Sequence, residues 1–348
     1  MNRLSACFVA TSTALVIAGC GSNSNNSTPQ GPTPTVTLSS ANVDAAARAS
    51  ANAAISSASM VNAAPASTGA SGTPSPPVRS LQQVLFKLTR QAVIDRAMVK
   101  SAAGSSTVPR AQALITRTDP CSSGSITSSL DDRDNSNSVS AGDVLTLTFN
   151  QCQNGTDLID GSVSATYSVV QSQPNFASAT ATVTYTQLHA SSADGDFSIN
   201  GSFNYSLSYD GSVYQAQLSI GVNDLTASVN AATYSDTVTL HAGYTVTGTR
   251  DPNALPQGSS TPGLDTLTVN GAVSAASIGG TILINTPMTF KQYDVDPYPR
   301  EGQLQVRGAN NGLLVLTVLS TSTVEVQLDA DANGAFEVDK IVPWTDLI

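Results

Sequence analysis

Charge is what this 348-residue sequence has little of, because Asp, Glu, Lys and Arg together make up only 11% of it. The 15 basic residues are outnumbered by 25 acidic ones, which gives a net charge of -10. Binding to a phosphate backbone needs clustered Lys and Arg that displace counterions, so the composition argues against nucleic acid as a partner. Neutral hydrogen-bonding side chains must then keep the protein soluble, which suits an exported β protein.

Residues that carry catalytic chemistry are also scarce. The sequence has two histidines, His189 and His241, and each follows a Leu near the end of a predicted strand. The chain after residue 20 has no Gly-x-Ser-x-Gly nucleophile elbow, no paired metal-binding His motif and no Gly-rich phosphate loop. We therefore predict that the protein is not an enzyme.

An export leader opens the chain. Residues 1–20 carry one positive side chain, Arg3, followed by an apolar run from Leu4 to Ile17 that is too short to span a bilayer. The run ends in Ile17-Ala18-Gly19-Cys20, which resembles the lipobox of bacterial lipoprotein precursors. An ordinary secretory leader is the alternative.

The lipobox resemblance implies a signal peptide over residues 1–19, cleavage before Cys20, and acyl chains such as palmitate on Cys20. Several acyl chains anchor a protein stably where one does not, so the membrane is an expected partner. The next residues are Gly21 and Ser22, and in similar lipoproteins of diderm bacteria the absence of Asp there favours the outer membrane. Which leaflet the protein faces stays open.

Two cysteines lie beyond the leader and the lipobox, Cys121 and Cys152. In an oxidising compartment we expect them to form a disulfide. It would close a loop of about 31 residues and add roughly 3 to 4 kcal/mol by restricting the unfolded chain. Two free buried thiols are the alternative.

Composition divides the rest of the chain before the β region into a tether and a helical segment. Residues 20–79 are rich in Ser, Asn, Pro and Ala, and we predict a flexible tether. Within them, residues 41–64 could form a weak helix, but no apolar stripe is present to dock it. Residues 80–118 are predicted to be a helix and a linker, because Ser80 and Gln83 form a capping box before apolar residues at helical spacing.

From residue 119 to residue 348 the apolar residues recur with period two. Between Phe197 and Tyr209, for example, apolar side chains alternate with Ser and Asn, which gives a strand with one dry face. The predicted fold is mainly β, a long antiparallel meander curled into a barrel or a two-layer sheet, with one N-terminal amphipathic helix. A weak repeat indicates duplication: residues 159–163, 199–203 and 269–273 are alike around a central Gly.

The stretch from Asp132 to Asp143 has oxygen-bearing side chains at its first, third, fifth and twelfth positions. It is similar to the calcium loop of EF-hand and dockerin modules, in which the seventh residue gives its carbonyl. The resemblance implies calcium as a cofactor, held by Asp132, Asp134, Ser136, Ser138 and Asp143. Asp143 stands where an EF-hand has Glu, and strands are expected at both ends instead of helices. A plain hairpin turn is the alternative.

A second acidic stretch begins at Asp329. Asp331 and Asn333 take its third and fifth positions, while Lys340 takes the twelfth, so the ligand set is incomplete. Calcium bound by Asp329, Asp331 and Asn333 and a plain Asn-Gly turn are the two interpretations.

The segment from Glu301 to Leu347, and the one from Cys121 to Cys152, resemble parts of β-rich envelope lipoproteins of proteobacteria that have no assigned role. We therefore predict a lipid-anchored protein of the cell envelope with a non-enzymatic binding or structural role. Its partner would be an unknown protein or apolar ligand. One alternative is a carrier that holds a lipid or other apolar ligand against Phe203, Tyr205 and Leu218. Another is an envelope hydrolase, which requires a His within hydrogen-bond reach of a Ser and a carboxylate.

Overall fold

The structure is a computed structural model that describes residues 31–61, 113–136, 139–173, 176–193, 195–231, 234–258, 260 and 262–348. The predicted leader, Cys20 and the predicted helix after Ser80 lie outside these residues. Among the residues that are described, no helix is long and apolar enough to cross a membrane.

The described part of the chain is mainly β, as predicted. It contains the helix α1 (Val43–Val61) and the short helices η2 (Ala276–Ile278) and η3 (Trp344–Asp346). The strands are β1 (Ala113–Pro120), β2 (Ser123–Asp132), β3 (Val144–Asn154), β4 (Asp157–Gln173), β5 (Phe176–Ser192), β6 (Gly195–Tyr209), β7 (Tyr214–Ser219), β8 (Leu225–Ala231), β9 (Tyr234–Leu240), β10 (Thr245–Asp251), β11 (Leu264–Ala275), β12 (Gly280–Tyr293), β13 (Glu301–Arg307), β14 (Leu313–Val318), β15 (Thr323–Asp329) and β16 (Val338–Pro343). The strands therefore begin at Ala113, inside the segment 80–118 that was predicted to be helix and linker.

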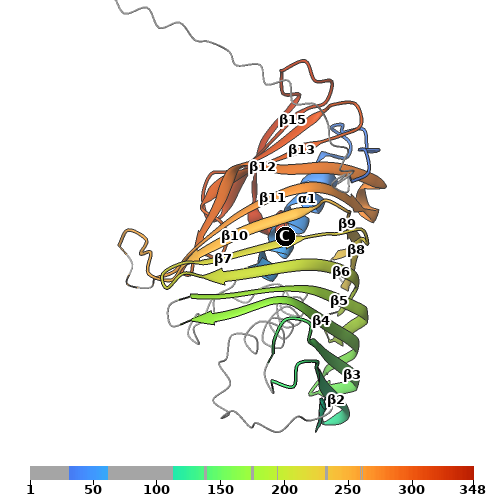
Figure 1. The fold of residues 1–348 in the computed structure, drawn as a ribbon. Helices are drawn as coiled ribbons and strands as arrows, with labels where there is room; N and C mark the ends of the chain where they lie inside the picture. The colour runs from blue at the N-terminus through green and yellow to red at the C-terminus, as the bar shows by residue number, and fades with distance from the viewer. Residues whose placement is uncertain are drawn as a thin grey trace, which may run out of the picture.

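All the strands form one antiparallel sheet that follows the order of the chain, which confirms the predicted meander (Figure 1). The exception lies in its middle. There β6 pairs with β8 through residues 195–201 and with β7 through residues 204–209. In the same way β11 pairs with β10 and, further along, with β9. The strands β6, β7, β10, β11, β9 and β8 therefore pair in a closed ring. The ring surrounds an interruption of the sheet, where the chain leaves β7 before it enters β8 and leaves β9 before it enters β10.

The sheet curls because its strands kink along one line. Gly161, Gly201 and Gly271, the central residues of the sequence repeat, have φ values of 102°, 119° and 141°. Only glycine adopts such values easily. A Cβ on Gly161 would collide with the backbone of Gln187 in β5, and a Cβ on Gly201 or Gly271 would collide with the backbone of Asp224 or Tyr244, directly before β8 and β10. The repeat that indicated duplication in the sequence is therefore a bending device.

The residue before the glycine takes part in the same device. Asp160 Oδ1 accepts the backbone N–H of Gln151 at 3.0 Å, and Asn200 Oδ1 accepts that of Gln187 at 3.1 Å. Gln151 and Gln187 lie at β-bulges of the preceding strands and have φ values of 45° and 46°. Each bulge is thus capped by a side chain of the next strand, which bends both strands together.

The sheet wraps around α1, which contradicts the expectation that residues 41–64 lack a face that could dock (Figure 1). The buried side chains of α1 are small or aliphatic: Val43, Ala46, Ala47, Ala49, Ser50, Ala51, Ala53, Ala54, Ile55 and Ser57. Because most of them are Ala or Ser, the helix is buried by close approach to the sheet and not by a stripe of large apolar residues.

Polar contacts hold α1 and the segment before it in place. Ser57 Oγ lies 3.1 Å from the hydroxyl of Tyr244, and Asn52 donates to the carbonyl of Leu347 at 3.1 Å. Before the helix, the backbone N–H groups of Thr35 and Val36 donate to the carbonyl oxygen of Thr281 on β12. The prediction of a flexible tether over residues 20–79 is therefore wrong for residues 31–61.

The predicted disulfide is present. Cys121 precedes β2, Cys152 lies in β3, and their Cα atoms are 5.4 Å apart. The bond fastens one end of β2 to the bulge of β3, close to the line of kinks.

Candidate functional site

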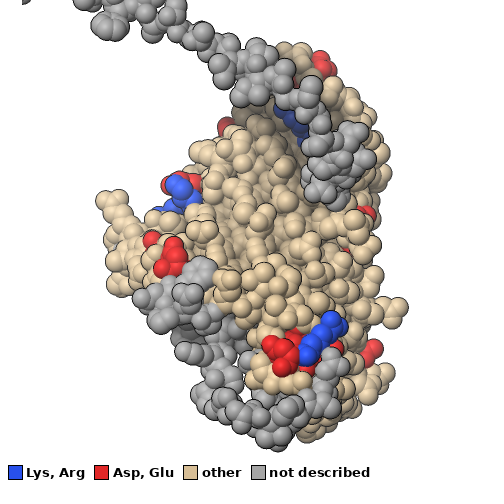
Figure 2. Space-filling model, in the orientation of Figure 1, with Lys and Arg blue, Asp and Glu red and all other residues tan. Residues whose placement is uncertain are grey.

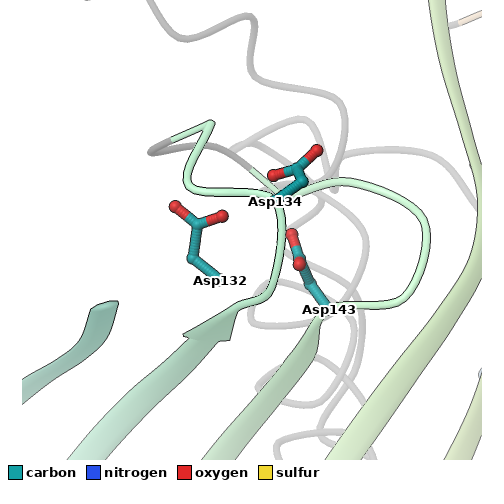
Figure 3. A group of neighbouring side chains, drawn as sticks. All are labelled: Asp132, Asp134 and Asp143. Atoms are coloured by element: carbon teal, nitrogen blue, oxygen red, sulfur yellow. The ribbon is translucent and has the colours of Figure 1, made fainter. Parts of the chain in front are cut away.

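The first acidic turn joins β2 to β3. Asp132 is the last residue of β2, and Asp143 directly precedes β3, so the hairpin brings the two ends of the acidic stretch together (Figure 3). One carboxylate oxygen of each of Asp132, Asp134 and Asp143 lies within 4.8 Å of the others. Asp132 and Asp143 are fully buried, whereas Asp134 is exposed. The structure thus brings together three of the predicted calcium ligands.

Backbone donors organise this turn. Ser136 gives its N–H to Asp132 Oδ1 and to Asp134 Oδ1, both at 3.0 Å. Asp143 accepts the N–H of Arg133 at 2.9 Å and that of Ser140 at 2.7 Å. Ser136 therefore contributes its N–H here, and Ser138 lies outside the described residues.

The charge of Asp134 is favoured in this setting. Its partial burial acts against the charge, but hydrogen bonds from the Ser136 and Ser140 side chains and from the Ser136 N–H hold the pKa of Asp134 below its usual value. The guanidinium of Arg133 pairs with Asp131, at 3.3 Å, outside the cluster. Three carboxylates held this close repel one another, and a hard divalent cation is the species that oxygen ligands of this kind stabilise.

The second acidic turn, between β15 and β16, repeats the frame of the first. Asn333 gives its N–H to Asp329 Oδ1 at 3.1 Å and to Asp331 Oδ1 at 3.2 Å. The fourth residue has a left-handed backbone in both turns, with φ values of 56° at Asn135 and 60° at Ala332. Two turns far apart in the chain thus fold alike.

The carboxylates gathered in the second turn include one that the sequence analysis did not single out. Carboxylate oxygens of Asp329, Asp331 and Glu337 lie within 4.8 Å of one another. The predicted Asn333 instead uses its side-chain oxygen to accept the N–H of Ala335 at 2.7 Å. Glu337 was missed, although it occupies the ninth position, which often serves a calcium loop.

The two histidines have different surroundings. His241 follows β9, and its Nδ1 lies 2.8 Å from Asp224 Oδ2, while its Nε2 lies 2.6 Å from Ser274 Oγ. His189 Nε2 lies 3.8 Å from Asp196, and both of these side chains are exposed. The hydrolase alternative required a His within hydrogen-bond reach of a Ser and a carboxylate, and His241 meets this condition. The sequence alone gave no signal that Ser274 of β11 would lie beside it.

The outer face of the sheet is uncharged over a wide area. In β4–β7, β10 and β11, on one side of the line of kinks, the residues that alternate with buried ones are all Ser, Thr, Asn or Gln. The next strand, β12, places Lys291 beside Thr266 at the margin of this area. They are Ser162, Ser164, Thr166 and Ser168 of β4, Ser178, Thr180, Thr182, Thr184 and Thr186 of β5, Ser202, Asn204, Ser206 and Ser208 of β6, Gln215, Gln217 and Ser219 of β7, Thr245, Thr247 and Thr249 of β10, and Thr266, Thr268 and Asn270 of β11. Figure 2 shows a broad face of the molecule with charged side chains at its margins.

The outer face carries pairs of threonine hydroxyls and two hollows. Thr247 and Thr268 lie 2.7 Å apart between their hydroxyl oxygens, as do Thr249 and Thr266. The hollows have volumes of about 510 and 320 Å³. Thr, Ser and Gln line most of the smaller one, whereas the larger one combines Thr and Asn with Arg307 and with apolar residues such as Leu283 and Ile284.

Comparison with known proteins adds no relative: no family model, no curated protein and no solved structure matches this chain. The class that the fold and the sites define is a curled antiparallel β-sheet domain built around an alanine-rich helix.

Proposed function

We propose that the protein is a lipoprotein of the cell envelope, anchored at the outer membrane through Cys20. The proposal is supported by the resemblance of residues 17–20 to a lipobox. The disulfide between Cys121 and Cys152 also supports it, since such bonds persist in oxidising compartments. Mass spectrometry of the protein from its native membrane is the test. It should find acylated Cys20 as the first residue, and an unmodified thiol there would refute the anchor.

The role that we propose for the domain is binding of an uncharged, hydroxyl-bearing polymer to its outer face. The observation that carries this proposal is the array of Ser, Thr, Asn and Gln side chains on β4–β7, β10 and β11. An ionic partner would find no opposite charge on these residues, whereas a neutral polysaccharide can exchange hydrogen bonds with hydroxyls and amides.

Retention on beads that carry a neutral polysaccharide, compared with beads that carry an anionic one, tests this role. Thr247→Lys places a charge beside Thr268 in the middle of the face and should lower retention on the neutral beads. Thr118→Lys is the matched control, because Thr118 also pairs with a threonine, Thr127 at 3.1 Å, but lies on the edge strand β1. Equal retention on both kinds of bead, or equal loss in both variants, would refute the proposal.

The carrier alternative has less support. Phe203, Tyr205 and Leu218, which were expected to line a cavity, are buried, and α1 lies against the inner side of the sheet. The two hollows described above lie instead on the polar outer face.

Calcium binding by the two acidic turns is a second candidate function. The observation that favours it is the shared frame, in which one N–H bridges the first and third carboxylates in both turns. Bound ions would then stabilise the fold, since a ligand that binds only the native state must raise its stability.

A further inference from the structure

We propose that Asp224, His241 and Ser274 form a hydrolytic centre in which Ser274 is the nucleophile, with a neutral carboxylic ester as substrate. This inference goes beyond the binding role proposed above and would revise the expectation that the protein is not an enzyme. It rests on the geometry of three side chains from three separate segments of the chain.

The centre lies where the sheet is interrupted. Asp224 ends the segment between β7 and β8, and His241 begins the segment between β9 and β10. Backbone hydrogen bonds hold the two segments together, from Ile220 N to the Tyr244 carbonyl at 2.8 Å and from Gly243 N to the Ile220 carbonyl at 3.0 Å. The interruption therefore frees two short loops to present polar side chains beside β11.

Both carboxylate oxygens of Asp224 have a partner. Its Oδ1 accepts the backbone N–H of Ala242 at 3.1 Å, while its Oδ2 contacts His241 Nδ1 at 2.8 Å. The carboxylate thus holds both the loop and the ring of His241, which is the task of the orienting acid in a nucleophile–base–acid set.

When Asp224 is ionised and the ring of His241 is neutral, the contacts allow one order of protons. The carboxylate only accepts, so His241 then carries its proton on Nδ1 and leaves Nε2 as an acceptor. The hydroxyl of Ser274, 2.6 Å from Nε2, must then be the donor. Ser274 Oγ in turn accepts from the hydroxyl of Thr281, 2.7 Å away. This polarity is the one that a general base needs to take the proton of a serine nucleophile.

Thr281 is a positioning residue, and it is well held itself. Its backbone N–H donates to Thr35 Oγ1 at 2.9 Å, and its carbonyl accepts from Thr35 N. At the other end of this segment, a Cβ placed on Gly31 would lie 2.9 Å from the carbonyl oxygen of Ala242. Residues 31–35 therefore border the centre, from the His241 loop to β12.

The centre is partly exposed on the outer side of the sheet. Ser274 is half-buried, and 15% of the His241 side chain and 44% of the Asp224 side chain are exposed. The carboxylate of Asp224 would repel an anionic substrate, and the neighbouring outer-face residues of β9, Thr237 and Thr239, are uncharged. A neutral ester fits these surroundings.

The reaction balances without a co-reactant other than water. Ser274 Oγ attacks the ester carbonyl carbon while its proton passes to His241 Nε2. The bond between that carbon and the alkoxy oxygen breaks, and the proton on Nε2 goes to the leaving oxygen, which departs as an alcohol. Water then attacks the acyl-serine with His241 as base, releasing the carboxylic acid and restoring the Ser274 hydroxyl.

A fluorophosphonate probe, which reacts with activated serines, tests the centre on the purified full chain. Peptide mass spectrometry should find the label on Ser274, and Ser274→Ala should abolish it. Ser228→Ala is the matched control, since Ser228 also bonds a threonine across the sheet, Thr237 at 2.9 Å, and it should leave labelling unchanged. An unlabelled folded protein, or equal labelling in Ser274→Ala, would overturn the proposal.

Hydrolysis of p-nitrophenyl acetate gives a second readout. His241→Gln should lower the rate by roughly 100-fold or more, the usual effect of losing a general base. Asp224→Asn should lower kcat with KM unchanged, because it disturbs the tautomer of His241 and not substrate binding. Circular dichroism shows whether each variant is folded. A folded Asp224→Asn variant with unchanged kcat would refute the role of Asp224.

Discussion

Asp132 and Asp143 are both fully buried, and their carboxylates meet at the ends of β2 and β3. Two buried like charges destabilise a fold unless a cation or a proton balances them. If calcium binds here, the melting temperature should be higher in excess calcium than in chelator. At a calcium concentration of 100 times the Kd, the free energy of unfolding should rise by about 2.7 kcal/mol.

The double variant Asp132→Asn with Asp143→Asn should reduce this difference. Asp131→Asn, which removes a neighbouring carboxylate that pairs with Arg133, should keep it. Equal melting temperatures in chelator and calcium for the unmodified protein would rule out calcium as a stabilising ligand of either turn.

The disulfide closes a long loop and should carry a large share of the stability. Replacing both Cys121 and Cys152 by Ser should lower the free energy of unfolding by roughly 3 to 4 kcal/mol, because the unfolded chain gains freedom. Urea unfolding of the two forms measures the difference. A change below 1 kcal/mol would mean that the bulge of β3 holds its place without the bond.

The glycine kinks make a sharper prediction. A Cβ on Gly161 would collide with the carbonyl oxygen of Gln187, and its φ is 102°. Gly161→Ala should therefore destabilise by more than the roughly 1 to 3 kcal/mol that backbone strain alone costs.

Gly155→Ala separates the effect of the positive φ from the effect of the collision with the neighbouring strand. Gly155 also has a positive φ, 64°, but a Cβ there meets nothing within 4 Å. It should cost about 1 to 2 kcal/mol, the ordinary penalty of a left-handed residue. Equal effects of the two substitutions in urea unfolding would show that the neighbouring strand yields at Gly161.

Much of the fold was predictable because burial of one sheet face imposes strict alternation. Phe197 and Ile199 before the kink, and Phe203 and Tyr205 after it, are buried as the pattern required. The role of Gly201 was not predictable, since its φ depends on the backbone of the adjacent segment at Asp224.

The parts that were missed depend on contacts distant in sequence. Ala46 and Ala54 of α1 are fully buried, but Ala is too weakly apolar to mark a docking face in a sequence. The acidic turns were predictable because their pattern is local, whereas Ser274 and His241 are 33 residues apart and met only in the folded sheet.

Tyr244 offers a test of how α1 is docked. The residue is buried, and its hydroxyl lies 3.1 Å from Ser57 Oγ. Burial raises the pKa of Tyr244 above the ordinary value, although the hydrogen bond between Tyr244 and Ser57 acts the other way. The folded state therefore holds the neutral phenol. Its contribution to stability is complete below the unfolded pKa of about 10 and is lost as pH rises toward the higher folded value.

Stability should then fall above about pH 10, with a slope of up to about 1.4 kcal/mol per pH unit from this residue. Tyr244→Phe should remove that part of the slope and cost about 1 kcal/mol at neutral pH, because it gives up the hydrogen bond to Ser57. Tyr234, whose pKa is also raised by burial and by Asp236, is the matched case: Tyr234→Phe should leave the contribution of Tyr244 in place. Urea unfolding at pH 8, 10 and 11 measures all three proteins. If Tyr244→Phe left the slope unchanged, the phenol would have to be accessible to hydroxide in the folded state, and α1 could not lie against it as described.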